Sequence, residues 1–219
     1  MAHRFLELAN TPSVKAEQAR HGSRDAYSRQ EGGAATHDTL SPTEAAFIAA
    51  RDSFYIATAS ETGWPYIQHR GGPQGFLKVL DPHTLGFADY RGNRQYISLG
   101  NVSVSPRISL FLMDYPNQRR LKLLGRMTSH DLRDNPDLAA RLADTSYSGR
   151  PERLFTIAVE AFDWNCPQHI TPRYTEAELH HVLEPVRDRI AALKAENLAL
   201  QTRLDAALQQ RSPGAAHPA

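Results

Sequence analysis

The chain has 219 residues, of which 41% are hydrophobic and 22% are charged, as expected for a globular protein with a substantial core. Its 25 Lys and Arg residues balance 24 Asp and Glu residues, and this formal net charge of +1 gives no case for binding nucleic acid or a membrane. Cys166 is the single cysteine, which excludes an intramolecular disulfide, and we find neither an apolar leader nor a run of 18 apolar residues, so we expect a cytoplasmic protein.

The first 40 residues are polar and form an N-terminal extension, in which we expect one short helix at residues 12–20. The rest of the extension needs to pack onto another part of the chain to be ordered. Ser41-Pro42-Thr43-Glu44 then combines a helix N-cap, a proline at the first helical position and an acidic first turn. This pattern predicts a helix that ends near Arg51.

From Ser53 to Asn165 the sequence changes to short runs of apolar, aromatic and β-branched residues. We expect strands at residues 54–59, 66–70, 76–80, 84–88, 107–113, 120–126 and 154–162. Helices near residues 95–99 and at 132–142 interrupt this series. Six or seven short strands joined by tight turns predict a mainly β (α+β) fold, in which a β-barrel carries helices on its outside.

Residues 175–208 have the spacing of a coiled coil. Apolar residues alternate at intervals of three and four, with Asn197 at the one polar position. They are Leu179, Leu183, Val186, Ile190, Leu193, Leu200, Leu204 and Ala207. With Asn197 at an a position we expect a parallel two-stranded pair, although Arg189 and Lys194 would then face each other with like charge. The alternative is an amphipathic helix packed on its own barrel.

These patterns divide the chain into four parts. They are an extension (residues 1–40), a barrel (41–174), a C-terminal helix (175–210) and a tail (211–219) whose Pro, Gly and Ala content predicts disorder.

The common metal and nucleophile signatures are missing from this sequence. His180 and His181 are adjacent and so point to different faces, and no HxxxH or CxxC spacing occurs, so we expect no zinc site. GxSxG, P-loop and GxGxxG motifs are also missing, which leaves no basis for a hydrolase or a nucleoside triphosphatase. We interpret Arg119-Arg120 as a solvated strand end.

Polar residues at two strand ends indicate a phosphate site. Gln68-His69-Arg70-Gly71-Gly72 ends one strand with polar side chains followed by glycines, which allow the backbone to approach a ligand closely. Asp89-Tyr90-Arg91-Gly92-Asn93-Arg94 follows another strand and leads into a helix, whose first amides and the Arg94 guanidinium suit a phosphate. The alternative is a surface turn with ordinary arginines.

The order of these segments resembles the pyridoxamine 5′-phosphate oxidase family over about residues 41–173. The resemblance is carried by Gln68 to Gly72, Phe87 to Asp89 with Arg91 to Arg94, Ser105 to Phe111, Arg120 to Gly125, and Trp164-Asn165-Cys166-Pro167-Gln168-His169-Ile170-Thr171-Pro172-Arg173. The last block is similar to a bacterial subgroup of oxidase-like proteins. The resemblance implies a split β-barrel that binds FMN in the groove between the two subunits of a homodimer.

The resemblance also implies a set of cofactor-binding residues. They are Gln68, His69, Arg70, Phe87, Ala88, Asp89, Asn93, Arg94, Arg120, Trp164 and Gln168. In this set Arg70 and Arg94 hold the phosphate, and Trp164 and Gln168 come from the partner subunit. Arg120 replaces a glutamine of the family, and a cation there would stabilise negative charge on a reduced flavin.

The residues that hold the vitamin B6 substrate in the oxidases are mostly missing, with only Arg173 retained in the block Thr171-Pro172-Arg173-Tyr174. We therefore expect an FMN-dependent oxidoreductase acting on an unidentified small molecule, with His169 as a candidate proton donor or, alternatively, a structural residue. Cys166 is interpreted as a packed residue or as a thiol near the flavin. The rival interpretations are a flavin carrier or sensor without turnover, and the same barrel binding haem or a deazaflavin.

Overall fold

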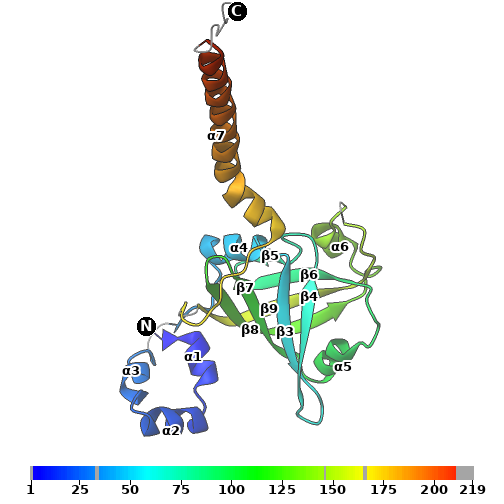
Figure 1. Cartoon of the computed structure of the whole chain (residues 1–219). Helices are drawn as coiled ribbons and strands as arrows, with labels where there is room; N and C mark the ends of the chain where they lie inside the picture. Colours follow the sequence, from blue (N-terminus) through cyan, green and yellow to red (C-terminus); the bar gives the residue numbers. More distant parts are fainter. Residues whose placement is uncertain (1, 33–34, 146, 165–166, 211–219) are drawn as a thin grey trace, which may run out of the picture. The chain divides into compact units, whose positions relative to one another are not determined.

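The computed structural model describes residues 2–32, 35–145, 147–164 and 167–210 (Figure 1). The chain divides into two compact units, residues 1–172 and 173–219. The tail at residues 211–219, for which we predicted disorder, lies outside the described residues, and so do Asn165 and Cys166.

A seven-stranded antiparallel sheet forms the body of the first unit and curls on itself (Figure 1). Across the sheet the strands are β4 (Pro65–Gly71), β3 (Ser53–Ala59), β7 (Arg107–Asp114), β8 (Arg119–His130), β9 (Pro151–Trp164), β6 (Thr84–Tyr90) and β5 (Lys78–Asp81). The expected split β-barrel of six or seven strands with flanking helices is therefore confirmed. Strands β8 and β9 extend beyond their predicted bounds.

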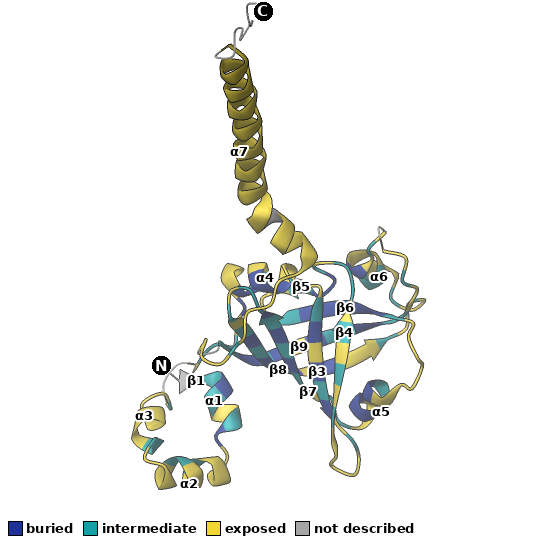
Figure 2. Cartoon of the chain, in the orientation of Figure 1, coloured by how far each residue is buried: buried dark blue, intermediate teal, exposed yellow. Residues whose placement is uncertain are grey.

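Alternation along the strands fills the interior of the barrel. On β3, for example, Phe54 and Ile56 are buried while Tyr55 between them is exposed. The buried residues accordingly lie along the strands in Figure 2, and Phe54 packs edge-on against Phe87 with ring centroids 5.3 Å apart. These aromatic contacts fix β3 and β6 on opposite sides of one core.

Gly125 allows the two longest strands to pair closely. The register of β8 against β9 shifts between Leu124 and Gly125. A Cβ atom added to Gly125 would lie 2.6 Å from the carbonyl oxygen of Ala158 on β9, a separation too short for carbon and oxygen. Only glycine fits at this irregularity, which bends the sheet.

Helix α4 (Pro42–Ala49) begins as predicted. The Ser41 hydroxyl oxygen accepts a hydrogen bond from the backbone N–H of Thr43 at 3.1 Å. In turn, a carboxylate oxygen of Glu44 accepts one from the backbone N–H of Ser41 at 2.9 Å. Glu44 is buried, and its second oxygen accepts a hydrogen bond from Trp164 Nε1 at 2.9 Å. This carboxylate therefore links α4 to the end of β9.

Three predicted boundaries were wrong. The run at residues 95–99 belongs to a longer and later helix, α5 (Ile97–Val104), and residues 132–142 contain only α6 (Pro136–Leu142), because Pro136 starts the helix. The strand predicted at 76–80 begins only at Lys78. Phe76 instead closes a turn, its N–H donating to the Pro73 carbonyl at 3.0 Å.

Among its described residues the N-terminal extension contains three helices, of which one was predicted. Helix α2 (Pro12–Arg20) confirms the prediction, whereas α1 (Arg4–Ala9) and α3 (Arg24–Ser28) were missed. In addition, β1 (Ala2–His3) pairs in parallel with β2 (Ala35–Thr36). Such short elements depend on distant contacts rather than on their own sequence.

His3 connects the extension to the barrel. Its Nε2 lies 3.3 Å from Asp163 Oδ1 on β9, and its ring stacks on His37 with centroids 4.0 Å apart. Burial lowers the pKa of His3, the neighbouring His37 lowers it further, and Asp163 opposes the shift. The fold therefore favours the neutral form of His3.

The second unit contains helix α7 (Glu176–Gln210), which confirms the helix predicted at residues 175–208. Every side chain of α7 that the structure describes is exposed (Figure 2). Among the helices of the described residues, none combines the length and the apolar character needed to cross a bilayer.

Candidate functional site

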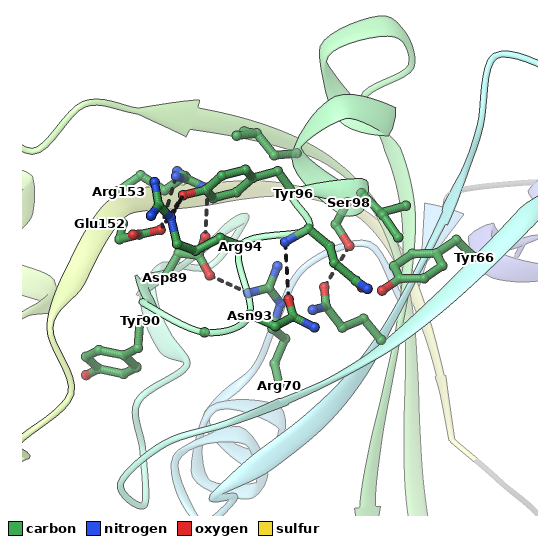
Figure 3. Close-up of a pocket in the computed structure, with 15 residues that line it drawn as sticks. Tyr66, Arg70, Asp89, Tyr90, Asn93, Arg94, Tyr96, Ser98, Glu152 and Arg153 are labelled. Atoms are coloured by element: carbon green, nitrogen blue, oxygen red, sulfur yellow. Dashed lines mark hydrogen bonds and ion pairs between the residues drawn. The ribbon is translucent and has the colours of Figure 1, made fainter.

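A pocket of about 240 Å³ opens where β4, the end of β6, the start of β9 and the first turn of α5 meet (Figure 3). We call it the arginine pocket, because Arg70, Arg94 and Arg153 all line it. Two acidic residues, Asp89 and Glu152, are also part of the lining. The walls come from four segments that are distant in sequence.

Asp89 lies between two of these arginines. One carboxylate oxygen accepts from Arg70, and the other lies 3.2 Å from a terminal nitrogen of Arg153 (Figure 3). Asp89 is only 6% exposed. Burial raises the pKa of its carboxyl group, and the positive charges of Arg70 and Arg153 oppose that shift. Asp89 thereby fixes both guanidinium groups in the wall of the pocket.

A second group of contacts orders the loop before α5. The Tyr96 hydroxyl donates to Glu152 at 3.3 Å and accepts from Arg94 Nε at 3.1 Å. The Arg153 guanidinium lies 4.7 Å from the centre of the Tyr96 ring, within the range of a cation–π contact. Tyr96 therefore connects the exposed Arg94 to the charged start of β9.

The backbone of this loop is strained. Arg94 and Tyr96 both adopt left-handed conformations, with φ of 62° and 54°, which non-glycine residues rarely adopt. Between them the N–H of Gln95 donates to Asn93 Oδ1 at 3.2 Å. The loop leads directly into α5, whose first N–H groups have no partners within the helix. Strain of this kind is common at binding sites.

The side chain of Ser98 faces the pocket from the first turn of α5. Its hydroxyl donates to Gln68 Oε1 on β4 at 2.9 Å (Figure 3). This bond connects α5 to the edge strand of the sheet and leaves the hydroxyl oxygen able to accept. Ser98 is buried, so its position is fixed by packing as well as by this bond.

A second pocket, of about 260 Å³, adjoins the first across Arg70 and Asp89. We call it the aromatic pocket, because Phe76, Phe87 and Tyr147 line it. Phe87 is almost completely buried, so its side chain belongs to the barrel core. The two pockets lie side by side and share Gln68, Arg70 and Asp89.

The structure brings together most of the residues predicted to bind a cofactor. Gln68, Arg70, Asp89, Asn93 and Arg94 line the arginine pocket. His69, Phe87 and Ala88 line the aromatic pocket. Arg120, Trp164, Gln168 and His169 line neither of these pockets. The roles assigned to all these residues remain predictions.

The four outlying residues have other surroundings in this chain. Arg120 lies on β8, and its guanidinium carbon is 5.2 Å from the centre of the Phe111 ring. Trp164 donates to Glu44 and packs edge-on against Phe47. Gln168 and His169 are exposed in a turn.

The sequence interpretation missed Tyr96, Ser98, Glu152 and Arg153. Arg153 was read as lying outside the last strand, which we predicted to begin at residue 154, whereas β9 begins at Pro151. A charged pair directly before an apolar strand was the only local signal. No sequence pattern relates Arg153 to Asp89, 64 residues earlier.

The lining of the arginine pocket has the chemistry of an anion site. Three arginines face two carboxylates, and two hydrogen-bonding groups, Ser98 and the amide of Asn93, lie nearby. Arg70 Nε is a buried donor that has no partner among the described residues. A phosphate would add acceptors to this excess of donors. Within the same described residues, no group of three or more His, Cys, Asp and Glu side chains could hold a metal ion.

The family model described as pyridoxamine 5′-phosphate oxidase matches residues 40–164. Among curated proteins, none matches the chain.

Solved structures with similar folds include three bacterial proteins. An FMN-binding protein from Syntrophomonas wolfei subsp. wolfei is 13% identical, with 70% of this chain and 95% of that chain covered and a TM-score of 0.43. A FAD-binding protein from Mesorhizobium loti is 18% identical, with 57% and 94% covered and a TM-score of 0.40. HupZ of Group A Streptococcus is 14% identical, with 62% and 100% covered and a TM-score of 0.44.

Proposed function

Because the chain belongs to the pyridoxamine 5′-phosphate oxidase family, whose model matches more than half of it, we propose that it binds FMN and acts as an oxidoreductase on a small molecule. The observation that carries this proposal is the convergence of Arg70, Arg94 and the first turn of α5 on one pocket. The residues present fit a phosphate because donors exceed acceptors there, including the unpartnered Arg70 Nε.

In this proposal the FMN phosphate is held by Arg94, by Ser98 and by the backbone amides at the start of α5. Arg94 is the exposed arginine of the pocket, and within the described residues it donates only through Nε to Tyr96. Its two terminal nitrogens therefore remain available as a fork for phosphate oxygens. Asp89 restrains Arg70 and Arg153, so these two act by position and charge.

A second copy of the chain completes the proposed site. The arginine pocket, at about 240 Å³, and the adjoining aromatic pocket, at about 260 Å³, are each smaller than the roughly 300–1,000 Å³ of most complete ligand sites. Exposed apolar side chains occur on the elements that form the pocket, namely Trp64 and Ile67 on the β3–β4 hairpin and Ile97 and Val104 on α5. Such a surface favours burial against another subunit. In the proposal Trp164 and Gln168 face the cofactor of the partner subunit. Arg120 is the proposed cation at the flavin ring, and His169 is the proposed proton donor.

A bound flavin would supply hydride or electron transfer, and the chain would supply binding, orientation and charge. The lining of the aromatic pocket includes His69 together with the buried rings of Phe76 and Phe87. The remaining candidate, a carrier or sensor without turnover, uses the same binding residues and differs only in reactivity.

Visible absorption of the purified protein tests the proposal directly. We expect flavin bands, or binding of added FMN with quenching of its fluorescence. Absence of both would refute the proposal. Absorption bands of haem or of a deazaflavin would show that the barrel binds that cofactor instead of FMN. Anaerobic mixing with NADH or NADPH then separates an enzyme from a carrier, since a carrier would not be reduced at a useful rate.

A further inference from the structure

Helix α7 carries an apolar seam that is open to solvent. Its large seam residues have exposed fractions between 42% and 60%. They are Leu179, Leu183, Val186, Ile190, Leu193, Leu200 and Leu204, spaced by three and four residues and interrupted only at Asn197. A long helix in water gains most of its stability from packing an apolar face against a partner. The regular spacing makes another helix of the same kind the best-fitting partner.

Asn197 selects both the partner and its direction. The seam runs through an a position at Asn197 and through d positions that are all apolar, from Leu179 to Ala207. In a parallel pair of identical helices each a position faces itself, so the two Asn197 amides can hydrogen-bond to each other. In an antiparallel pair an a position faces a d position, which would leave Asn197 buried without a partner. A second, parallel copy of α7 therefore satisfies the one polar group in the seam.

The other features of α7 are compatible with this arrangement. Arg189 and Lys194 would face each other across a parallel pair, but they lie at the exposed margins, where like charges repel weakly. Leaving a buried amide unpaired costs more than such a contact. Pro185 lies inside the helix at a c position, on the side away from the seam, so it does not interrupt the apolar contacts.

We propose that α7 forms a parallel, in-register, two-stranded coiled coil with α7 of a second copy of this chain. Such a pair would also tether the two barrels to each other. The association of the two barrels would then be effectively intramolecular, and each barrel would meet the other at an effective concentration in the millimolar range. Only this consequence rests on the proposed flavin-binding dimer. The pairing of α7 itself does not depend on flavin binding.

Disulfide trapping in the full-length protein tests the pairing. In a Cys166→Ser background, Leu204→Cys places one thiol in the seam, whereas Thr202→Cys places it on the opposite side of the same turn. Under mild oxidation we expect a covalent dimer with Leu204→Cys and at most a trace with Thr202→Cys. Leu179→Cys, at the other end of the seam, provides an independent second site.

Equal cross-linking of the seam and control variants, or none in either seam variant, would overturn the proposal. A helix packed on its own barrel, an antiparallel pair or a different protein partner would each give that negative result. Light scattering of the uncross-linked protein should give the mass of two chains, and three or more chains would also overturn the proposal. None of these readouts requires flavin, so they remain informative if the proposed function fails.

The concentration at which the dimer dissociates on dilution measures how strongly α7 tethers the two barrels. The double variant Ile190→Glu, Leu193→Glu places charges in the seam, and Ala191→Glu, Ala192→Glu adds the same charges on the outer side as a control. We expect the seam variant to dissociate at a concentration at least about 100-fold higher than the control. Dissociation of both variants at the same concentration would show that α7 does not tether the barrels.

Discussion

Replacing Arg94 by alanine should weaken FMN binding selectively through the phosphate. In the structure Arg94 is exposed and held by a single hydrogen bond of 3.1 Å from Nε to the Tyr96 hydroxyl. Its terminal nitrogens are therefore free to bind phosphate oxygens without breaking an ion pair. Riboflavin has the same ring system and no phosphate, so it serves as the matched ligand for every variant.

The expected size of the effect follows from the exposure of Arg94. Solvent screens a charged hydrogen bond at an exposed arginine, so the loss is moderate for a contact of this kind. We expect roughly a tenfold higher Kd for FMN. Arg94→Lys keeps the charge but loses the forked geometry, so we expect an intermediate effect of about threefold.

Fluorescence titration of the apoprotein measures both ligands. We expect Arg94→Ala to change riboflavin affinity by less than about twofold, since the lost contact is to phosphate alone. Arg20→Ala, which removes an exposed arginine from α2, should change neither affinity. Unchanged FMN binding in Arg94→Ala, or an equal loss for FMN and riboflavin, would show that the phosphate does not bind at Arg94.

Three further predictions concern stability. Asp89→Ala should destabilise the fold by about 3–5 kcal/mol in urea unfolding, because it leaves two largely buried arginines without their carboxylate; a loss under 1 kcal/mol would contradict this. Gly125→Ala should cost about 1–3 kcal/mol or more, because its Cβ would lie 2.6 Å from a backbone oxygen. Gly100→Ala, with open space around it, should cost nothing, and equal losses would refute the steric argument. Since the fold lowers the pKa of His3, stability should fall as the pH drops below about 6.5 and the unfolded chain takes up the proton first. His3→Phe should reduce this fall between pH 7.5 and 5.5, and an undiminished fall would exclude His3 as its cause.

Several elements of this protein could be predicted because their signals are local. Ser41 and Glu44 lie three residues apart, and that spacing alone specifies the start of α4. The regular apolar spacing from Leu179 to Leu204 likewise predicts the helix α7. The polar residues of the segments 68–72 and 89–94 predict a phosphate site, which stays a prediction, and Arg70, Asp89 and Arg94 line one pocket.

Other features follow only from the tertiary structure. The order β4-β3-β7-β8-β9-β6-β5 places the start of β9 next to the end of β6, and only this pairing brings Arg153 to Asp89. Helices α1 and α3 were missed because the extension depends on contacts with distant residues, such as that of His3 with Asp163 on β9. For Trp164, the family resemblance gave a role at a partner's flavin, which remains a prediction, while its contact with Glu44 could not be read from the sequence.

The difference between the features that the sequence predicts and those that need the tertiary structure has a physical cause. Caps, turns and apolar periodicity act over a few residues, so the amino-acid sequence by itself determined where most strands, α4 and α7 would form. Charge pairs across a sheet depend on strand register and on how far the sheet curls, and these are settled by the packing of the whole core. The barrel therefore decided which arginines Asp89 holds, and which one, Arg94, stays open to solvent.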